Sequence, residues 1–116
     1  MTTPRKLAEV LAARTAVRRE AAERRSRAAK AQLVARLRAL PGIERAWLIG
    51  SLGKPHFGER SDADVVMEGL SADAWGRTWS DLQLGLEVSL DLLRLEELEP
   101  DFAERVRTEG ELVVGS

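Results

Sequence analysis

The segment that most constrains the fold is residues 4–40, in which no glycine or proline follows Pro4. Eleven alanines dominate it, together with leucine, arginine, glutamate and lysine, and all of these residues favour helix. Apolar side chains recur at helical spacing near its start and again over residues 29–40, whereas residues 23–27 offer nothing to bury. The pattern predicts two helices, or one long helix whose N-terminal part projects from the domain, ended by Pro41-Gly42.

Charge is divided unevenly along the chain. Residues 1–40 carry 11 Lys/Arg and 3 Glu, a net charge of +8, whereas residues 41–116 carry 7 Lys/Arg and 16 Asp/Glu, a net charge of −9. The basic half suits nucleic acid, an acidic protein surface or the acidic half of another copy, although a solvated arginine-rich helix explains it equally well. We therefore predict a basic helical extension over residues 1–27 and a domain over residues 28–116.

Composition excludes several classes of site. A length of 116 residues suits one small domain, and the absence of cysteine excludes disulfides, thiolate metal sites and cysteine nucleophiles. Residues 1–6 are followed by charge rather than by the apolar stretch of a signal peptide, and no run is apolar enough to span a bilayer. These features lead us to expect a cytoplasmic protein with no membrane association.

The remainder of the chain alternates short apolar runs with helical patterns. Strands are predicted at residues 45–50, 63–67, 87–93 and 112–114, and helices at residues 71–85 and 100–109. About ten residues join the first two strands, too few for a parallel crossover, so these strands should be antiparallel. A full helix joins the second and third strands, which should therefore be parallel. The expected fold is α/β (α+β), with a small mixed sheet and helices on one side.

The residues suited to chemistry gather around the second predicted strand. Asp62 and Asp64 are two residues apart, so in a strand both side chains point to one face. Two adjacent carboxylates repel each other, and a divalent cation removes that conflict. Oxygen ligands of this kind suit Mg²⁺, which binds one or two carboxylates and completes its shell with water and substrate phosphates.

A phosphate-binding loop is predicted directly before these carboxylates. Gly50 permits a close backbone approach, and Ser51 offers a hydroxyl and an N–H group. Lys54 and Arg60 lie in the same loop and can neutralise phosphate charge. One segment thus offers a phosphate cradle and two metal ligands, which suits phosphoryl or nucleotidyl transfer.

The pattern Gly50-Ser51-x10-Asp62-x-Asp64 resembles the signature of the minimal nucleotidyltransferases (MNT) of the DNA polymerase beta superfamily. That family uses a third aspartate on a neighbouring strand, and Asp91 stands in the matching context within residues 87–93. The resemblance covers roughly residues 30–114. It implies a polymerase-beta-like nucleotidyltransferase fold preceded by the long basic N-terminal helix.

The resemblance also implies a role for each matched residue. Gly50 and Ser51 would hold the triphosphate of ATP, Asp62 and Asp64 would ligate Mg²⁺, and Asp91 would bind a second Mg²⁺ and help deprotonate the acceptor hydroxyl. The loop departs from many relatives, which have a small residue and Arg-Gly where this chain has Gly53, Lys54 and Pro55.

Three functions are compatible with this reading. Small proteins that resemble this chain are often paired with a HEPN-type ribonuclease toxin, as type VII antitoxins that transfer AMP to a toxin hydroxyl. The alternatives are a nucleotidyltransferase that acts on RNA or a small molecule, with the arginine-rich helix binding phosphates, and a catalytically silent binding module. His56 either contacts the base or acceptor or has no role, while Trp75 and Trp79 are predicted as core or interface residues.

Overall fold

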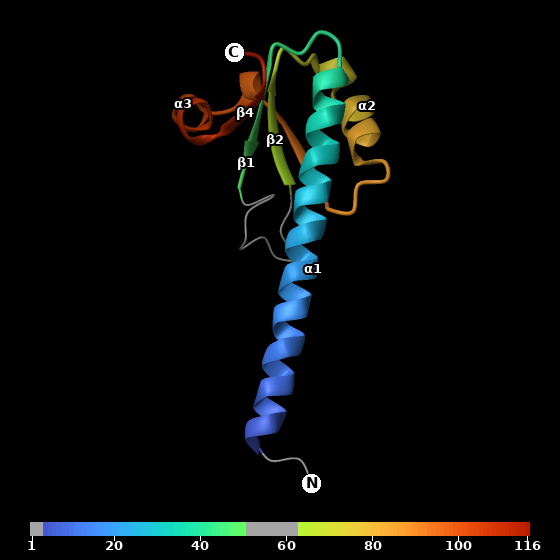
Figure 1. Cartoon of the computed structure of the whole chain (residues 1–116). Helices are drawn as coiled ribbons and strands as arrows, with labels where there is room; N and C mark the ends of the chain where they lie inside the picture. The colour runs from blue at the N-terminus through green and yellow to red at the C-terminus, as the bar shows by residue number, and fades with distance from the viewer. Residues whose placement is uncertain (1–3, 51–62) are drawn as a thin grey trace.

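The computed structural model describes residues 4–50 and 63–116, and within the first range the side chains from residue 6 onward. The elements are helix α1 (Pro4–Ala39), strands β1 (Arg45–Ile49) and β2 (Ala63–Glu68), helix α2 (Ala72–Gln83), strand β3 (Leu90–Arg94), the 3-10 turn η1 (Leu95–Glu97), helix α3 (Pro100–Glu109) and strand β4 (Glu111–Val114). Figure 1 shows the sheet beside the upper part of α1, whose N-terminal part extends away from it.

The four strands form one mixed sheet in the order β3-β2-β1-β4. Strand β1 pairs antiparallel with β2 and β4, whereas β2 and β3 are parallel and are joined through α2. Both predicted strand directions are confirmed. Helix α2 lies in the connection between β2 and β3 and provides the crossover that a parallel pair requires.

Helix α1 is one continuous helix rather than two. Every side chain from residue 6 to residue 20 is exposed, and burial begins at Ser26 and Ala29. Leu33 and Leu37, one and two turns further on, are fully buried at 0% exposure. The apolar face therefore anchors the C-terminal part of α1, and the N-terminal part projects, giving the molecule a longest dimension of 64 Å.

The sheet is covered on both faces. Leu33 and Leu37 of α1 and Leu82 of α2 join one core with the inward side chains of β2 and β3. On the opposite face, Val106 of α3 packs in a second core with Trp47 of β1. Helices α1 and α2 thus lie together on one side as expected, but α3 covers the other, because β1 and β2 carry apolar side chains on both faces.

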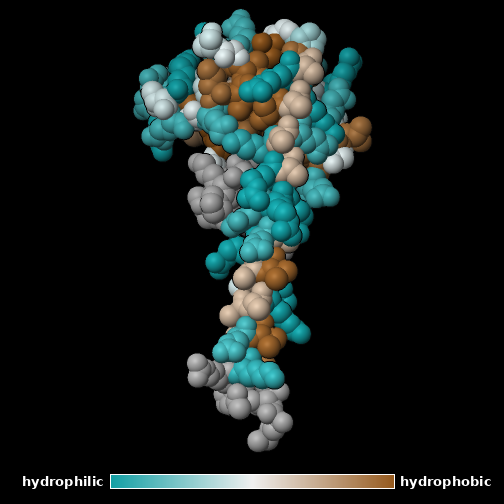
Figure 2. Space-filling view, in the orientation of Figure 1, coloured by the Kyte–Doolittle hydropathy of each residue, from teal (hydrophilic) through white to brown (hydrophobic). Residues whose placement is uncertain are grey.

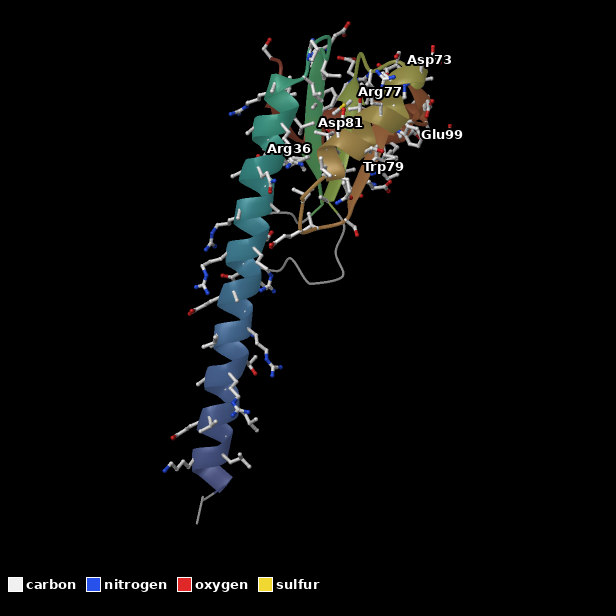
Figure 3. The ribbon with its side chains drawn as sticks, turned by 90° about the vertical axis from the view of Figure 1, so that its right-hand side faces the viewer. Arg36, Asp73, Arg77, Trp79, Asp81 and Glu99 are labelled. Atoms are coloured by element: carbon white, nitrogen blue, oxygen red, sulfur yellow. The ribbon has the colours of Figure 1, made fainter. Side chains whose placement is uncertain are left out.

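Side chains of α1 bind the main chain of neighbouring elements. The Arg36 guanidinium donates to the carbonyl oxygens of Leu82, at 2.8 Å, and Leu84, at the end of α2, and Figure 3 shows it pointing from α1 towards that helix. Arg38 donates to the Val113 carbonyl of β4 at 3.1 Å. These bonds satisfy carbonyl groups that a helix end and an edge strand leave without partners.

Helix α2 carries its charges away from the sheet. Asp73, Arg77 and Asp81 recur every four residues and are exposed, as Figure 3 shows. Ser71 begins the helix as predicted, because its hydroxyl accepts a hydrogen bond from the Ala74 N–H at 3.2 Å. Throughout residues 4–50 and 63–116, no helix combines the length and the apolarity needed to cross a bilayer.

Candidate functional site

Gly50 directly follows β1 and adopts a backbone conformation that suits glycine. Its φ is +91°, a left-handed value that side chains rarely adopt. A Cβ atom placed there would lie 3.5 Å from the Asp64 Oδ2 atom of β2. Gly50 and the Asp64 carboxylate therefore lie side by side.

Two of the three predicted aspartates lie on adjacent strands in the same register. Asp64 of β2 is the partner of Asp91 of β3. Their chain neighbours, including Val65 and Leu92, are buried in the core beneath α1 and α2. Because successive side chains alternate between faces, both carboxylates project on the opposite face, which α3 partly covers. Adjacent strands are about 4.8 Å apart, so these carboxylates are close neighbours.

The rest of the predicted site lies outside the described residues. This applies to Ser51, Lys54, Arg60 and Asp62 as predicted ligands of phosphate or metal, and also to His56. Within residues 4–50 and 63–116, no cluster of three or more His, Cys, Asp or Glu residues is arranged to hold a metal ion.

The donor set suits a divalent cation nonetheless. Asp64 and Asp91 supply hard oxygen ligands from one face, and their mutual repulsion favours a cation between them. Mg²⁺ typically binds to one or two carboxylates and takes its other ligands from water and phosphate. The described pair therefore fits the group that the sequence predicts.

A row of side chains on α2 holds the strand that carries Asp91. Strand β3 is at the edge of the sheet, so among residues 4–50 and 63–116 no strand pairs with the outward groups of Leu90 and Leu92. The Trp75 indole N–H donates to the Leu92 carbonyl at 2.9 Å, and the Trp79 indole N–H donates to the Leu90 carbonyl at 2.8 Å. Leu90 and Leu92 flank Asp91, so α2 fixes the backbone on each side of it.

Gln83 completes this row. Its amide oxygen accepts from the Leu90 N–H at 2.8 Å, and its amide nitrogen donates to the Val88 carbonyl at 2.8 Å. The three α2 residues, at positions 75, 79 and 83, recur every four residues and so share one face of the helix. Sequence analysis placed the two tryptophans in a core or interface but missed their bonds to β3, although the four-residue spacing was a signal for a common role.

The Trp75 and Trp79 rings also contact each other. Their centroids are 5.0 Å apart in an edge-to-face arrangement. Such a pair stabilises the surface by about 0.5–1.5 kcal/mol beyond the area that it buries. The arrangement covers the edge of the sheet, where an open strand would otherwise pair with another chain.

We compared the chain and its fold with known proteins. No protein-family model matches the chain, and no curated protein matches it. Several solved structures are similar to it, and three of them are described below. A toxin–antitoxin structure with AMP-PNP is 22% identical, with 73% of this chain and 72% of that chain covered and a TM-score of 0.60. A rebuilt and re-refined structure of the tri-AMPylated Shewanella oneidensis HEPN toxin in complex with MNT antitoxin is 21% identical, with 78% and 73% covered and a TM-score of 0.58.

The third is a structure of the toxin–antitoxin MntA–HepT, with 21% identity, 76% of this chain and 71% of that chain covered, and a TM-score of 0.56. The likeness confirms the predicted architecture. The chain has the MNT fold. In this MNT fold, the parallel pair β2–β3 brings Asp64 and Asp91 together, and the turn after β1 places Gly50 beside them.

Proposed function

We propose that the protein is a nucleotidyltransferase that moves AMP from ATP to a hydroxyl of a partner protein, as the antitoxin of a HEPN-type ribonuclease toxin. The observation that carries this proposal is the position of Asp64 and Asp91, in register on one face of the sheet, with Gly50 against the Asp64 carboxylate. The similar structures contain a HEPN toxin that is AMPylated and a toxin–antitoxin with AMP-PNP, which supports the same reaction and the same kind of partner here.

Each residue has a defined task in this reaction. Gly50 lets the triphosphate approach the main chain, and Ser51, Lys54 and Arg60 continue that cradle. Asp62 and Asp64 would hold one Mg²⁺, and Asp91 would contribute to a second Mg²⁺ site. When bound, Mg²⁺ neutralises charge on the attacking and leaving oxygens.

The transfer is a substitution at the α-phosphorus of ATP. The acceptor hydroxyl oxygen forms the new bond to that phosphorus, the bond to the bridging oxygen breaks, and pyrophosphate leaves. Asp91 accepts the hydroxyl proton, because its carboxylate lies in register with Asp64 on the adjoining strand, beside the reacting phosphorus. Carboxylates and main chain thus provide mainly positioning and charge stabilisation, which is what this chemistry needs.

The test uses ATP labelled in turn on the α- and γ-phosphate, together with the cognate toxin. We expect label on the toxin from the α-phosphate alone, and its loss in both Asp64→Asn and Asp91→Asn. Asp81→Asn is the matched control, because Asp81 is an exposed carboxylate on α2, on the other side of the sheet. Transfer of α-label that survives both site variants would reject the mechanism, and transfer of γ-label would indicate a kinase.

We further propose that residues 1–27 form a docking segment and residues 28–116 the transferase domain. The projecting part of α1 bears exposed apolar side chains, with Val10 43% and Val17 62% exposed, between basic residues. Figure 2 shows apolar side chains interspersed with hydrophilic ones along the projecting helix. Replacing Val10 and Val17 with serine should weaken toxin binding without lowering the melting temperature, and unchanged binding would remove the docking role.

The basic charge of α1 favours RNA as the second candidate acceptor. Residues 1–40 have a net charge of +8, and binding through such charges weakens steeply as salt rises. Fluorescence anisotropy with a labelled single-stranded RNA at 50 and 200 mM salt tests it. Absent or salt-insensitive binding would leave the protein acceptor as the better candidate.

A further inference from the structure

Gln83 is the last residue of α2, and its side-chain amide binds the outer edge of β3 where that strand begins. The amide oxygen accepts from the Leu90 N–H, and the amide nitrogen donates to the Val88 carbonyl, both at 2.8 Å. A residue of a neighbouring parallel strand would form this same pair of bonds, one on each side of Ser89. The Gln83 amide thus replaces a strand peptide at an edge where the described part of the chain provides no further strand.

The peptide unit between Ser89 and Leu90 is held from both sides. Its N–H donates to Gln83, and its carbonyl, which belongs to Ser89, accepts from the Ala63 N–H of β2 at 2.7 Å. Because a peptide unit is planar, a bond on one side fixes the direction of the group on the other side. The result is one chain of hydrogen bonds from α2 through β3 to β2, and the bonds in such a chain strengthen one another.

This chain of hydrogen bonds lies directly before the two carboxylates. Leu90 precedes Asp91 in β3. Ala63 precedes Asp64 in β2. The two preceding residues are register partners, and so are the two aspartates. The bonded peptide unit therefore fixes where β2 and β3 begin to pair, one residue ahead of the carboxylates that would bind metal.

The segment that leads from α2 into β3, residues 84–89, is mostly exposed. Leu86 is its one buried residue, and the Leu86 N–H donates to the Gln83 carbonyl at 3.0 Å. Gln83 therefore binds this segment through both its main chain and its side chain. Trp79 and Trp75 bind β3 further along, at the carbonyls of residues 90 and 92. Loss of the Gln83 amide should loosen the start of β3 while the tryptophans still hold the rest of the strand.

We propose that Gln83 is a positioning residue for the metal ions of the nucleotidyl-transfer site. Its hydrogen bonds go to the main chain of residues 86–90, so it acts on Asp64 and Asp91 through the peptide unit that precedes them. This role rests on the proposed function, because it concerns the same pair of carboxylates. Removing a group that orients metal ligands from outside typically lowers metal affinity or activity by about 10- to 100-fold.

The experiment measures the binding of Mn²⁺ alone to the full chain, from the loss of the free-ion signal in electron paramagnetic resonance. Gln83→Met removes the side-chain hydrogen bonds and keeps the length of the side chain, whereas Gln83→Glu keeps an oxygen that accepts from the Leu90 N–H. Gly42→Ala is the matched control for stability, since Gly42 has a φ of +77° and open space around it. Hydrogen exchange of the Ala63 amide, followed by NMR, is the second readout. Thermal unfolding confirms that each variant is folded at the temperature used.

Gln83→Met should weaken Mn²⁺ binding about 10-fold, at the lower end of the range for groups that orient metal ligands. It should also raise the exchange rate of the Ala63 amide, because the peptide unit that accepts from this amide is then held on one side only. Gln83→Glu should recover most of both losses, since a carboxylate oxygen is a strong acceptor. Gly42→Ala should lower the melting temperature and leave both readouts as in the wild type.

Four results would overturn the proposal. These are an unchanged Mn²⁺ affinity in Gln83→Met, an Ala63 amide as protected there as in the wild type, equal losses in Gln83→Met and Gln83→Glu, and equal losses in Gly42→Ala. Failure of the proposed function gives a different result, in which Gln83→Met weakens Mn²⁺ binding but the wild type transfers no α-label to the toxin. A wild type that does not bind Mn²⁺ would reject the metal site and, with it, the positioning role.

Discussion

Substitution of Gly50 with alanine is predicted to have two effects that can be measured separately. The left-handed backbone should lower stability, and the added methyl group beside Asp64 should lower AMP transfer. Substitution with alanine places an L side chain at a φ of +91°, where the left-handed conformation costs about 1–2 kcal/mol. The lower entropy of the unfolded chain returns about 0.4–1 kcal/mol. We expect Gly50→Ala to lower the free energy of unfolding by about 1 kcal/mol, or the melting temperature by about 4 °C in a domain of this size.

The effect on activity should be larger than this loss of stability. The added methyl group would be 3.5 Å from Asp64 Oδ2, an ordinary contact that forces no rearrangement, but it occupies the space beside the carboxylate. A triphosphate would be displaced by about the size of that methyl group. A misplacement of about 1 Å can reduce catalysis about a hundredfold. AMP transfer should therefore fall by about ten- to a hundredfold.

Gly42→Ala is the control for the backbone effect. Gly42 has a φ of +77° and no atom within 4 Å of an added Cβ. It should show a similar fall in melting temperature, measured by calorimetry, with AMP transfer unchanged at a temperature where both variants are folded. Equal losses of transfer in the two variants would refute the reasoning, since Gly50 would then be only a turn residue.

Three further predictions concern stability. Leu37 is fully buried, so Leu37→Ala should lower the free energy of unfolding by about 2–5 kcal/mol in urea titrations, whereas Val17→Ala, at 62% exposure, should change it by less than about 0.5 kcal/mol. Trp79→Phe removes the donor to the Leu90 carbonyl and should cost about 1–2 kcal/mol; hydrogen exchange should show weaker amide protection in β3, and unchanged protection would argue against the edge-strand role. Gly76→Ala lies within α2 with open space around it and should raise stability by about 0.5–1 kcal/mol, so a lower melting temperature would contradict the described helix.

The elements and strand directions followed from local patterns. Helix-favouring residues dominate residues 4–40, no glycine or proline follows Pro4, and α1 extends from Pro4 to Ala39. The connection lengths predicted one antiparallel and one parallel pair, and the sheet has both. These features can be predicted from the sequence because helix propensity and loop length act over short stretches of chain.

Local sequence patterns did not predict which face of the sheet α3 covers. The helix at residues 100–109 was predicted, but its position on the opposite face from α1 and α2 was not. Its side depends on Trp47 and Val66, which are apolar residues of β1 and β2 that need cover on that face. Each of these strands is apolar on both faces, and a short apolar run does not reveal which helix covers which face.

The sequence alone singled out Gly50, Asp64 and Asp91 as residues proposed to carry the chemistry, because they are recognisable by residue type, spacing and the strands on which they stand. Only the tertiary structure decided that Asp64 and Asp91 are register partners, and that Trp75 and Trp79 hold the strand that bears Asp91. The physical reason is that strand register and edge contacts arise between segments far apart in the chain. They depend on how two apolar faces pack, and no local pattern of residues records that.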